Sequence, residues 1–187
     1  YAHGKDQVNP GGNFDYHLKP FLAAMDAGVS AVMPYYGVPI NVTYEGVTYD
    51  QVGFAFSKQV VTDLLRGKLG FKGYVNSDTG IINDRAWGLE GKTVPERVAA
   101  AINGGTDVLS GFHDTQTITD LVRDGLLPEA RVTEAAKRLL EPMFKMGLFE
   151  NPYVDESLAT AAVGAAASRT IGLEVQRKSI VLLQNQN

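Results

Sequence analysis

The chain has 187 residues, of which 44% are hydrophobic and 20% are charged, a balance typical of a folded globular protein and not of a disordered one. With 17 basic and 21 acidic residues its formal net charge is −4, and no run of lysine or arginine could follow a phosphate backbone, so we do not expect a nucleic-acid partner. The absence of cysteine excludes disulfides, thiolate metal sites and cysteine nucleophiles.

The first 150 residues alternate helical and strand patterns. Apolar spacing, glycine stops and proline breaks define the segments. In chain order they predict a helix over residues 15–27, a strand over 29–33, a helix over 52–65, a strand over 72–78, a helix over 95–104, a strand over 106–110, and helices over 115–124 and 131–146. This alternation is typical of parallel strands joined by helical crossovers.

The pattern indicates an α/β fold class. Three predicted strands are too few for a closed eight-stranded barrel, which typically needs about 250 residues. A doubly wound open sheet fits the same alternation. The choice between part of a barrel and an open sheet is therefore left open by the pattern.

The composition changes after residue 150. An extended linker is expected from residue 151, followed by an alanine-rich helix over 163–178 and a buried strand over 180–185. We therefore divide the chain into a first domain, 1–150, and the start of a second domain, 151–187.

Both ends read as internal points of a longer protein. The chain begins with Tyr1 rather than Met, and it stops in the predicted strand 180–185, which would lack a partner. Its longest apolar stretches, such as 159–167, are far from the about 20 residues that span a membrane. We expect a fragment that has no membrane partner.

Asp78 is the sharpest candidate for a catalytic group. It stands where an apolar strand ends and a glycine-containing loop begins, in the run Ser77-Asp78-Thr79-Gly80. In parallel α/β folds, active sites collect at that end of the strands. A carboxylate there can attack a sugar carbon and form a covalent ester that water later breaks. The alternative is that Asp78 only accepts hydrogen bonds from loop amides.

Three further side chains could accompany Asp78. Met33 and Tyr36 follow the preceding strand and would lie at the same edge, where a tyrosine hydroxyl could orient the carboxylate and keep its pKa low. Ordinary core packing is the alternative for Met33, and a half-buried aromatic is the alternative for Tyr36. Trp87, the single tryptophan, could offer a flat face to a sugar ring or simply anchor its loop.

No metal or nucleotide cofactor is implied. The histidines lack the spacing and the neighbouring carboxylates of a metal site; they are His3, His17 and His113. The glycine-rich stretch 9–13 lacks the glycine spacing of a phosphate-binding or dinucleotide-binding loop. We assign the charged residues of the long loop to surface ion pairs; they are Asp84, Arg85 and Glu90.

Several motifs, in order along nearly the whole chain, resemble glycoside hydrolase family 3. They are His17-Leu18-Lys19-Pro20-Phe21, Val32-Met33-Pro34, Leu69-Gly70-Phe71-Lys72-Gly73, Ser77-Asp78, Gly105-Thr106-Asp107, Met146-Gly147-Leu148-Phe149 and Lys178-Ser179-Ile180-Val181-Leu182-Leu183-Gln184-Asn185. Their combination is far more specific than any one of them.

The resemblance implies a fold and a role for Asp78. It implies the C-terminal part of a TIM-like (β/α)8 barrel domain, followed by a linker and the first helix and strand of an α/β sandwich domain. It places Asp78 as the nucleophile of a retaining β-glucosidase-like enzyme, with Met33 and Tyr36 lining the subsite of the terminal sugar. A second carboxyl group, roughly 5 Å from the first, would protonate the leaving oxygen.

The same resemblance implies that essential groups lie elsewhere. The acid/base glutamate is expected beyond residue 187, and further sugar ligands are expected before residue 1, so we predict that this chain alone hydrolyses no glycoside. The expected partners are an oligosaccharide or glucoside substrate and the remaining segments of the same enzyme. The expected location is the periplasm or the outside of the cell.

One position departs from the family. Many of its β-glucosidases carry a tryptophan directly after the nucleophile, where this sequence has Thr79, and we hypothesise that Trp87 replaces it. A β-xylosidase on the same scaffold and a catalytically inactive carbohydrate-binding homologue are alternatives. An unrelated aldolase or lyase barrel would need a strand-end lysine or a metal cluster, whereas Lys72 is at the wrong end of its strand.

Overall fold

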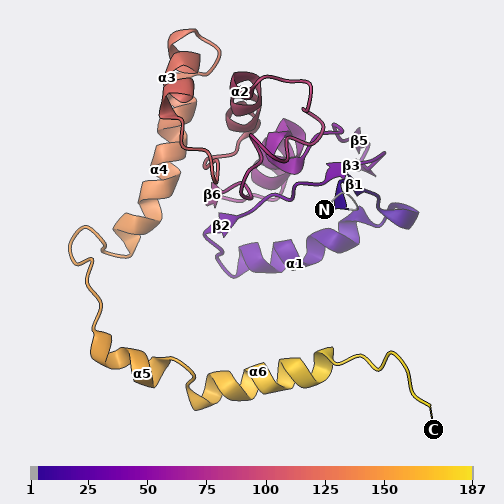
Figure 1. Ribbon diagram of the computed structural model, residues 1–187, viewed down its shortest axis with the longest axis vertical. Coiled ribbons are helices and arrows are strands. Elements are labelled where there is room, and N and C mark those ends of the chain that lie inside the picture. Colours follow the sequence, from indigo (N-terminus) through magenta and orange to yellow (C-terminus); the bar gives the residue numbers. More distant parts are fainter. Residues whose placement is uncertain (1–3, 187) are drawn as a thin grey trace. The chain divides into compact units, whose positions relative to one another are not determined.

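The computed structural model describes residues 4–186 (Figure 1). The chain divides into two compact units between Met146 and Gly147. In the first unit the strands are β1 (Asp6–Gln7), β2 (Ala31–Val32), β3 (Val38–Pro39), β4 (Thr43–Tyr44), β5 (Val47–Thr48) and β6 (Tyr74–Val75). Its helices are η2 (Pro10–Gly12), α1 (Phe14–Asp26), η3 (Phe54–Phe56), η4 (Gln59–Lys68), α2 (Val94–Gly104), α3 (Thr115–Arg123) and α4 (Glu129–Lys145).

Three segments predicted as strands lie side by side and parallel. β2 pairs with β6, with Ala31 opposite Tyr74. Asn76, just after β6, forms a parallel bridge with Val108. Val108 lies in the third predicted strand, residues 106–110, of which this bridge is the only strand-like pairing among the described residues. Because the three segments are parallel, the residues that follow them meet at one edge. This confirms the α/β class; closure into a barrel stays a prediction.

The other short strands of the first unit form two separate pairs. β1 pairs in parallel with β3, and β4 pairs antiparallel with β5. No strand was predicted in residues 34–51, because strands of two residues leave no detectable period of alternation.

The predicted helix over 52–65 is wrong at its start. Residues 54–56 form a short 3-10 turn, and the long helix η4 begins only at Gln59. Ser57 separates the two with an extended backbone, and its hydroxyl accepts a hydrogen bond from the N–H of Val60 at 3.3 Å. A serine at this position satisfies a free amide of the first helical turn, so the helix starts after it.

Helix α2 agrees with its prediction and shows clear end signals. Thr93 and Glu96 form a capping box, in which each side chain accepts a hydrogen bond from the other residue's N–H. Gly105 ends the helix with φ 117°, a left-handed conformation that favours glycine. The helix packs into the main core with its buried face; that core consists of Ala55, Phe56, Ile81, Ile82, Ala86, Val98, Ala101, Ile102, Leu121 and Leu127.

A buried carboxylate ties β6 to two helices. The Asp107 side chain is 0% exposed, and its Oδ2 accepts hydrogen bonds from the N–H of Val75 at 2.8 Å and from Nη2 of Arg66 at 2.6 Å. Its Oδ1 accepts from Arg131 at 2.8 Å and from Arg138 at 3.1 Å. Since Arg66 belongs to η4 and the other two arginines to α4, this Asp107 cluster fixes both helices to the strand.

The second unit contains η5 (Glu156–Leu158), α5 (Ala159–Ala162) and α6 (Ala166–Ser179). The linker from residue 151 and the alanine-rich helix agree with their predictions to within a few residues. The predicted strand over 180–185 is wrong in this structure: the segment has no regular structure, and Leu183 is 92% exposed. A strand needs a neighbour for its backbone hydrogen bonds, and no described residue supplies one here.

Candidate active site

Asp78 lies three residues beyond β6, at the edge where the parallel segments end. Its side chain is neither buried nor fully exposed, and its Oδ1 accepts a hydrogen bond from the N–H of Thr79 at 2.7 Å. The hydroxyl of Ser77 donates to the carbonyl of Asp78 at 2.9 Å. Asp78 therefore combines partial access to solvent with a fixed main chain, as an attacking carboxylate requires.

Tyr36 reaches the same turn from the segment after β2. Its hydroxyl donates to the carbonyl of Thr79 at 2.6 Å. Its ring meets the Trp87 ring edge-on, with centroids 5.8 Å apart, and the Arg85 guanidinium lies 5.0 Å from its centre. Tyr36 thus connects the turn at Asp78 with Trp87 of the loop that follows.

The surroundings of Tyr36 raise its pKa above the usual 10.0. Burial is the largest cause, and the hydrogen bond and negative charge of Asp78 act in the same direction, while Arg85 partly opposes them. The phenol therefore stays protonated at neutral pH and keeps its proton for donation.

Trp87 belongs to a loop that is anchored at several points. Its carbonyl accepts a hydrogen bond from the N–H of Gly53 at 2.8 Å, and its neighbour Ala86 is buried in the core. A side chain added at Gly88 would come within 2.6 Å of the Gln51 carbonyl, so the loop backbone passes very close to that segment. Trp87 is therefore a half-buried ring on a well-supported loop.

Met33 shares the strand edge but not the cluster around Asp78. Its side chain is 59% exposed and lines an apolar cavity of about 390 Å³ together with Leu18 and Phe21 of α1. None of Asp78, Tyr36 and Trp87 lines that cavity.

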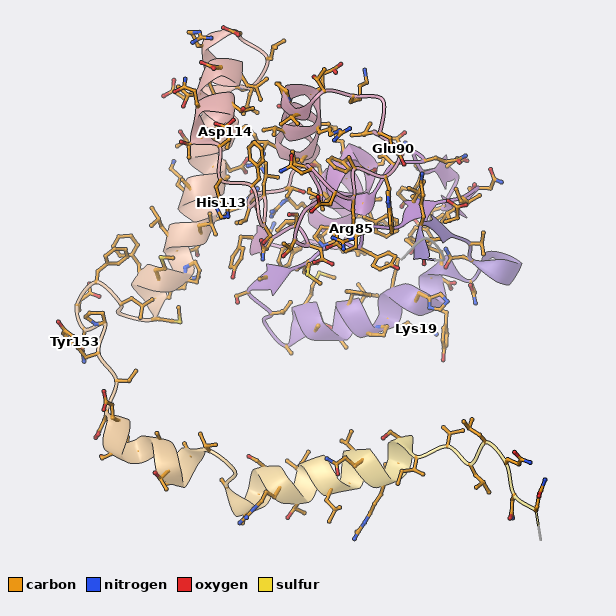
Figure 2. All side chains as sticks on the ribbon, in the orientation of Figure 1. Lys19, Arg85, Glu90, His113, Asp114 and Tyr153 are labelled. Carbon is orange, nitrogen blue, oxygen red and sulfur yellow. The ribbon has the colours of Figure 1, made fainter. Side chains whose placement is uncertain are left out.

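Arg85, one of the loop charges assigned to the surface, also contacts Tyr36 and the turn after Asp78. Its guanidinium covers the Tyr36 ring and donates to the Thr79 carbonyl at 3.4 Å; Arg85 is labelled in Figure 2. Asp84 is exposed, and Glu90 forms an ion pair with Lys5. The hydrogen bond from Lys5 is the main cause that lowers the pKa of Glu90.

Ser110 was not predicted as a site residue, but it contacts the Asp78 turn through both its amide and its carbonyl. It lies more than 30 residues from Asp78, and a serine at the end of a weak strand carries no local signal.

Within residues 4–186, no three His, Asp or Glu side chains gather as a metal site would require. Among the same residues, every helix is too short or too polar for a membrane span. His3 lies outside the described residues.

Residues 5–141 match the family model described as the glycosyl hydrolase family 3 N-terminal domain. The chain belongs to glycoside hydrolase family 3. A probable β-glucosidase C from Aspergillus oryzae is 42% identical over 195 residues, which cover 99% of this family 3 chain and 30% of the relative. A periplasmic β-glucosidase/β-xylosidase from Dickeya chrysanthemi is 36% identical, over 94% of this chain and 30% of the relative.

A solved structure agrees with the family assignment. A β-glucosidase involved in saponin metabolism from intestinal bacteria superimposes with a TM-score of 0.70 at 30% identity, covering 90% of the family 3 chain and 21% of that structure. This likeness supports the α/β fold. The family 3 chain thus spans less than a third of the length of each of these relatives.

Proposed function

We propose that this chain is the nucleophile-bearing part of a retaining exo-β-glycosidase that removes terminal non-reducing β-D-glucosyl residues. The observation that carries the proposal is Asp78, a partly exposed carboxylate at the carboxyl end of a parallel strand, with Oδ1 oriented by the Thr79 amide. The names of the Aspergillus and Dickeya relatives support the same class of activity.

The proposed reaction has two steps. Asp78 bonds to the anomeric carbon while the bond from that carbon to the leaving oxygen breaks, and a general acid gives that oxygen its proton. The same group then deprotonates a water, which attacks the anomeric carbon and releases Asp78, so the configuration is retained. We assign the general acid to a part of the protein outside this chain, since the chain covers only 30% of the Aspergillus relative.

We assign the sugar contacts on this chain to three side chains. Trp87 supplies the aromatic wall of the sugar subsite, and its ring packs on Tyr36. Tyr36 lines the same subsite, and its hydroxyl is held by the hydrogen bond to the Thr79 carbonyl. Met33 contacts the sugar from the outer rim of the strand edge, where it is exposed.

The wider assignments follow the same proposal. Residues 1–150 form the late part of a barrel domain, and residues 151–187 form the linker and start of a sandwich domain. The substrate is a glucoside or oligosaccharide, and the remaining segments of the enzyme complete the site. A periplasmic or extracellular location is supported by the word periplasmic in the name of the Dickeya relative.

A labelling experiment on the full-length protein tests the proposal. A 2-deoxy-2-fluoro-β-glucoside with a good leaving group should leave a stable ester, and peptide mass mapping should find it on Asp78. Asp78→Asn should lower turnover by at least about a thousandfold, whereas Asp84→Asn, at an exposed carboxylate of the same loop, should retain it. A label on another residue would refute the role of Asp78, and active protein without any label would refute a covalent mechanism.

β-Xylosidase activity is the second candidate, because the Dickeya relative is named for both activities. Comparing kcat/KM for matched aryl β-glucosides and β-xylosides decides between them. If neither substrate is turned over and no label forms, the protein is an inactive carbohydrate-binding homologue.

A further inference from the structure

The backbone of Asp78 is held by two serines from neighbouring strands. The Ser77 side chain is 1% exposed, and its hydroxyl accepts a hydrogen bond from the N–H of Ser110 at 3.0 Å while it donates to the Asp78 carbonyl at 2.9 Å. The Ser110 carbonyl accepts from the N–H of Gly80 at 3.0 Å. Ser110 therefore bonds to the turn on both sides of Asp78.

These contacts begin where the regular ladder of strand hydrogen bonds gives way to loop. The last pairing of the strand is the bridge between Asn76 and Val108, together with the bond from the Ser77 N–H to the Val108 carbonyl at 2.9 Å. Beyond that point the side chain of Ser77 and the hydroxyl of Ser110, which donates to Oδ1 of Asn76 at 2.9 Å, continue the connection between the two strands.

One peptide group transmits this connection to the Asp78 carboxylate. The peptide between Asp78 and Thr79 receives the Ser77 hydroxyl at its carbonyl, and its N–H donates to Oδ1 of Asp78 at 2.7 Å. A peptide group is planar, so a rotation that breaks the first bond also turns the N–H that orients the carboxylate.

We propose that the Ser77 hydroxyl, held in place by Ser110, is a positioning group that aims the Asp78 carboxylate through the peptide between Asp78 and Thr79. This inference rests on the proposed function, in which that carboxylate attacks a sugar. Ser77 touches no reacting atom; it sets the direction of the group that does.

The test measures the rate of ester formation in the full-length protein with the same 2-fluoro glucoside. Ser77→Ala should slow the labelling of Asp78 and lower kcat by about 10- to 100-fold, the size expected when a reacting group is misplaced by a fraction of an ångström to about 1 Å. The inhibition constant of glucose should change by less than about threefold, because the residues that contact the sugar are retained. Ser77→Thr keeps the hydroxyl and should restore most of the rate.

Ser57→Ala is the matched control. Ser57 is also 1% exposed, and its hydroxyl accepts one backbone N–H, that of Val60, away from Asp78. This variant should lose a similar amount of thermal stability and keep the wild-type labelling rate. Equal labelling rates in wild type and Ser77→Ala, or an equal loss in Ser57→Ala, would overturn the inference.

Two outcomes separate this inference from the proposed function. If the wild-type protein is not labelled on Asp78, the proposed function fails; if it is labelled and Ser77→Ala reacts at the same rate, only the positioning role fails. Should Ser77→Ala not fold, Ser77→Cys decides, since it keeps a side chain of similar shape but replaces the hydroxyl with a thiol, a weak hydrogen-bond donor and acceptor. A fall in its labelling rate of about threefold or more supports the inference, and an unchanged rate rejects it.

Discussion

Tyr36 connects the groups around Asp78 at the scale of single residues. Its hydroxyl bonds the Thr79 carbonyl, and its ring lies against Trp87 and under the Arg85 guanidinium. Because its pKa is raised above 10.0, the hydroxyl remains a donor throughout the neutral range. We therefore expect no loss of this contact below about pH 10.

Trp87 gives the first residue-scale prediction. If its ring forms the wall of the sugar subsite, Trp87→Ala should raise KM for an aryl β-glucoside by up to about tenfold, since an aromatic contact is worth up to about 1.4 kcal/mol beyond its buried area. Trp87→Phe keeps an aromatic ring and should stay within about threefold of wild type. Steady-state kinetics of the full-length protein measure this, and unchanged turnover and affinity in Trp87→Ala would exclude a sugar contact.

At the scale of elements, the cap of α2 makes a pH-dependent contribution. Hydrogen bonds from the backbone N–H of Thr93, then from its hydroxyl, lower the pKa of Glu96 from 4.5 to about 2. A lowered pKa means that the folded state favours the ionised form, so the stabilisation is present above pH 4.5 and is lost as the pH falls from 4.5 towards about 2.

An NMR titration of the Glu96 carboxyl carbon checks this prediction. The titration midpoint should lie at about 2 in the folded protein. Thr93→Ala should raise this midpoint without bringing it to 4.5, because the variant keeps the backbone N–H at position 93, which is the largest cause of the lowered pKa. A wild-type midpoint near 4.5 would mean that the capping box does not form in solution.

The Asp107 cluster gives the second element-scale prediction. Asp107→Asn leaves the guanidinium groups of three partly buried arginines without their shared carboxylate, and it should lower the free energy of unfolding by about 3 kcal/mol. Exchange of the Val75 amide hydrogen, which bonds Asp107, should accelerate. Asp63→Asn removes an exposed ion pair with Lys58 and should cost less than about 1 kcal/mol. An Asp107 variant as stable as the Asp63 variant would contradict this account.

At the scale of the whole molecule, the proposed enzyme needs more than this chain. The chain covers 30% of the Aspergillus and Dickeya relatives, and we place the general acid outside it. The isolated 187-residue chain should therefore show no measurable hydrolysis of an aryl β-glucoside, with the full-length protein as the positive control. Turnover by the isolated chain would require a general acid among its own residues.

The sequence by itself determined the order of the elements around Asp78 and its place at a strand end. These features depend on neighbours along the chain: apolar runs, glycine stops and the proline that opens α2 act within a few residues. The start of η4 was missed because Ser57, a local cap, interrupts an apolar spacing that otherwise suits one continuous helix.

The tertiary structure alone decided which side chains meet Asp78. Tyr36 and Ser110 come from segments that are distant from Asp78 in sequence, and their meeting with the Asp78 turn depends on the parallel pairing of β2, β6 and the segment at Val108. Trp87, in the loop after Asp78, joins them through its contact with Tyr36. The Asp107 cluster likewise needs helices η4 and α4 in place. Contacts of this kind follow from packing across the fold, and a local pattern of residue types carries no information about them.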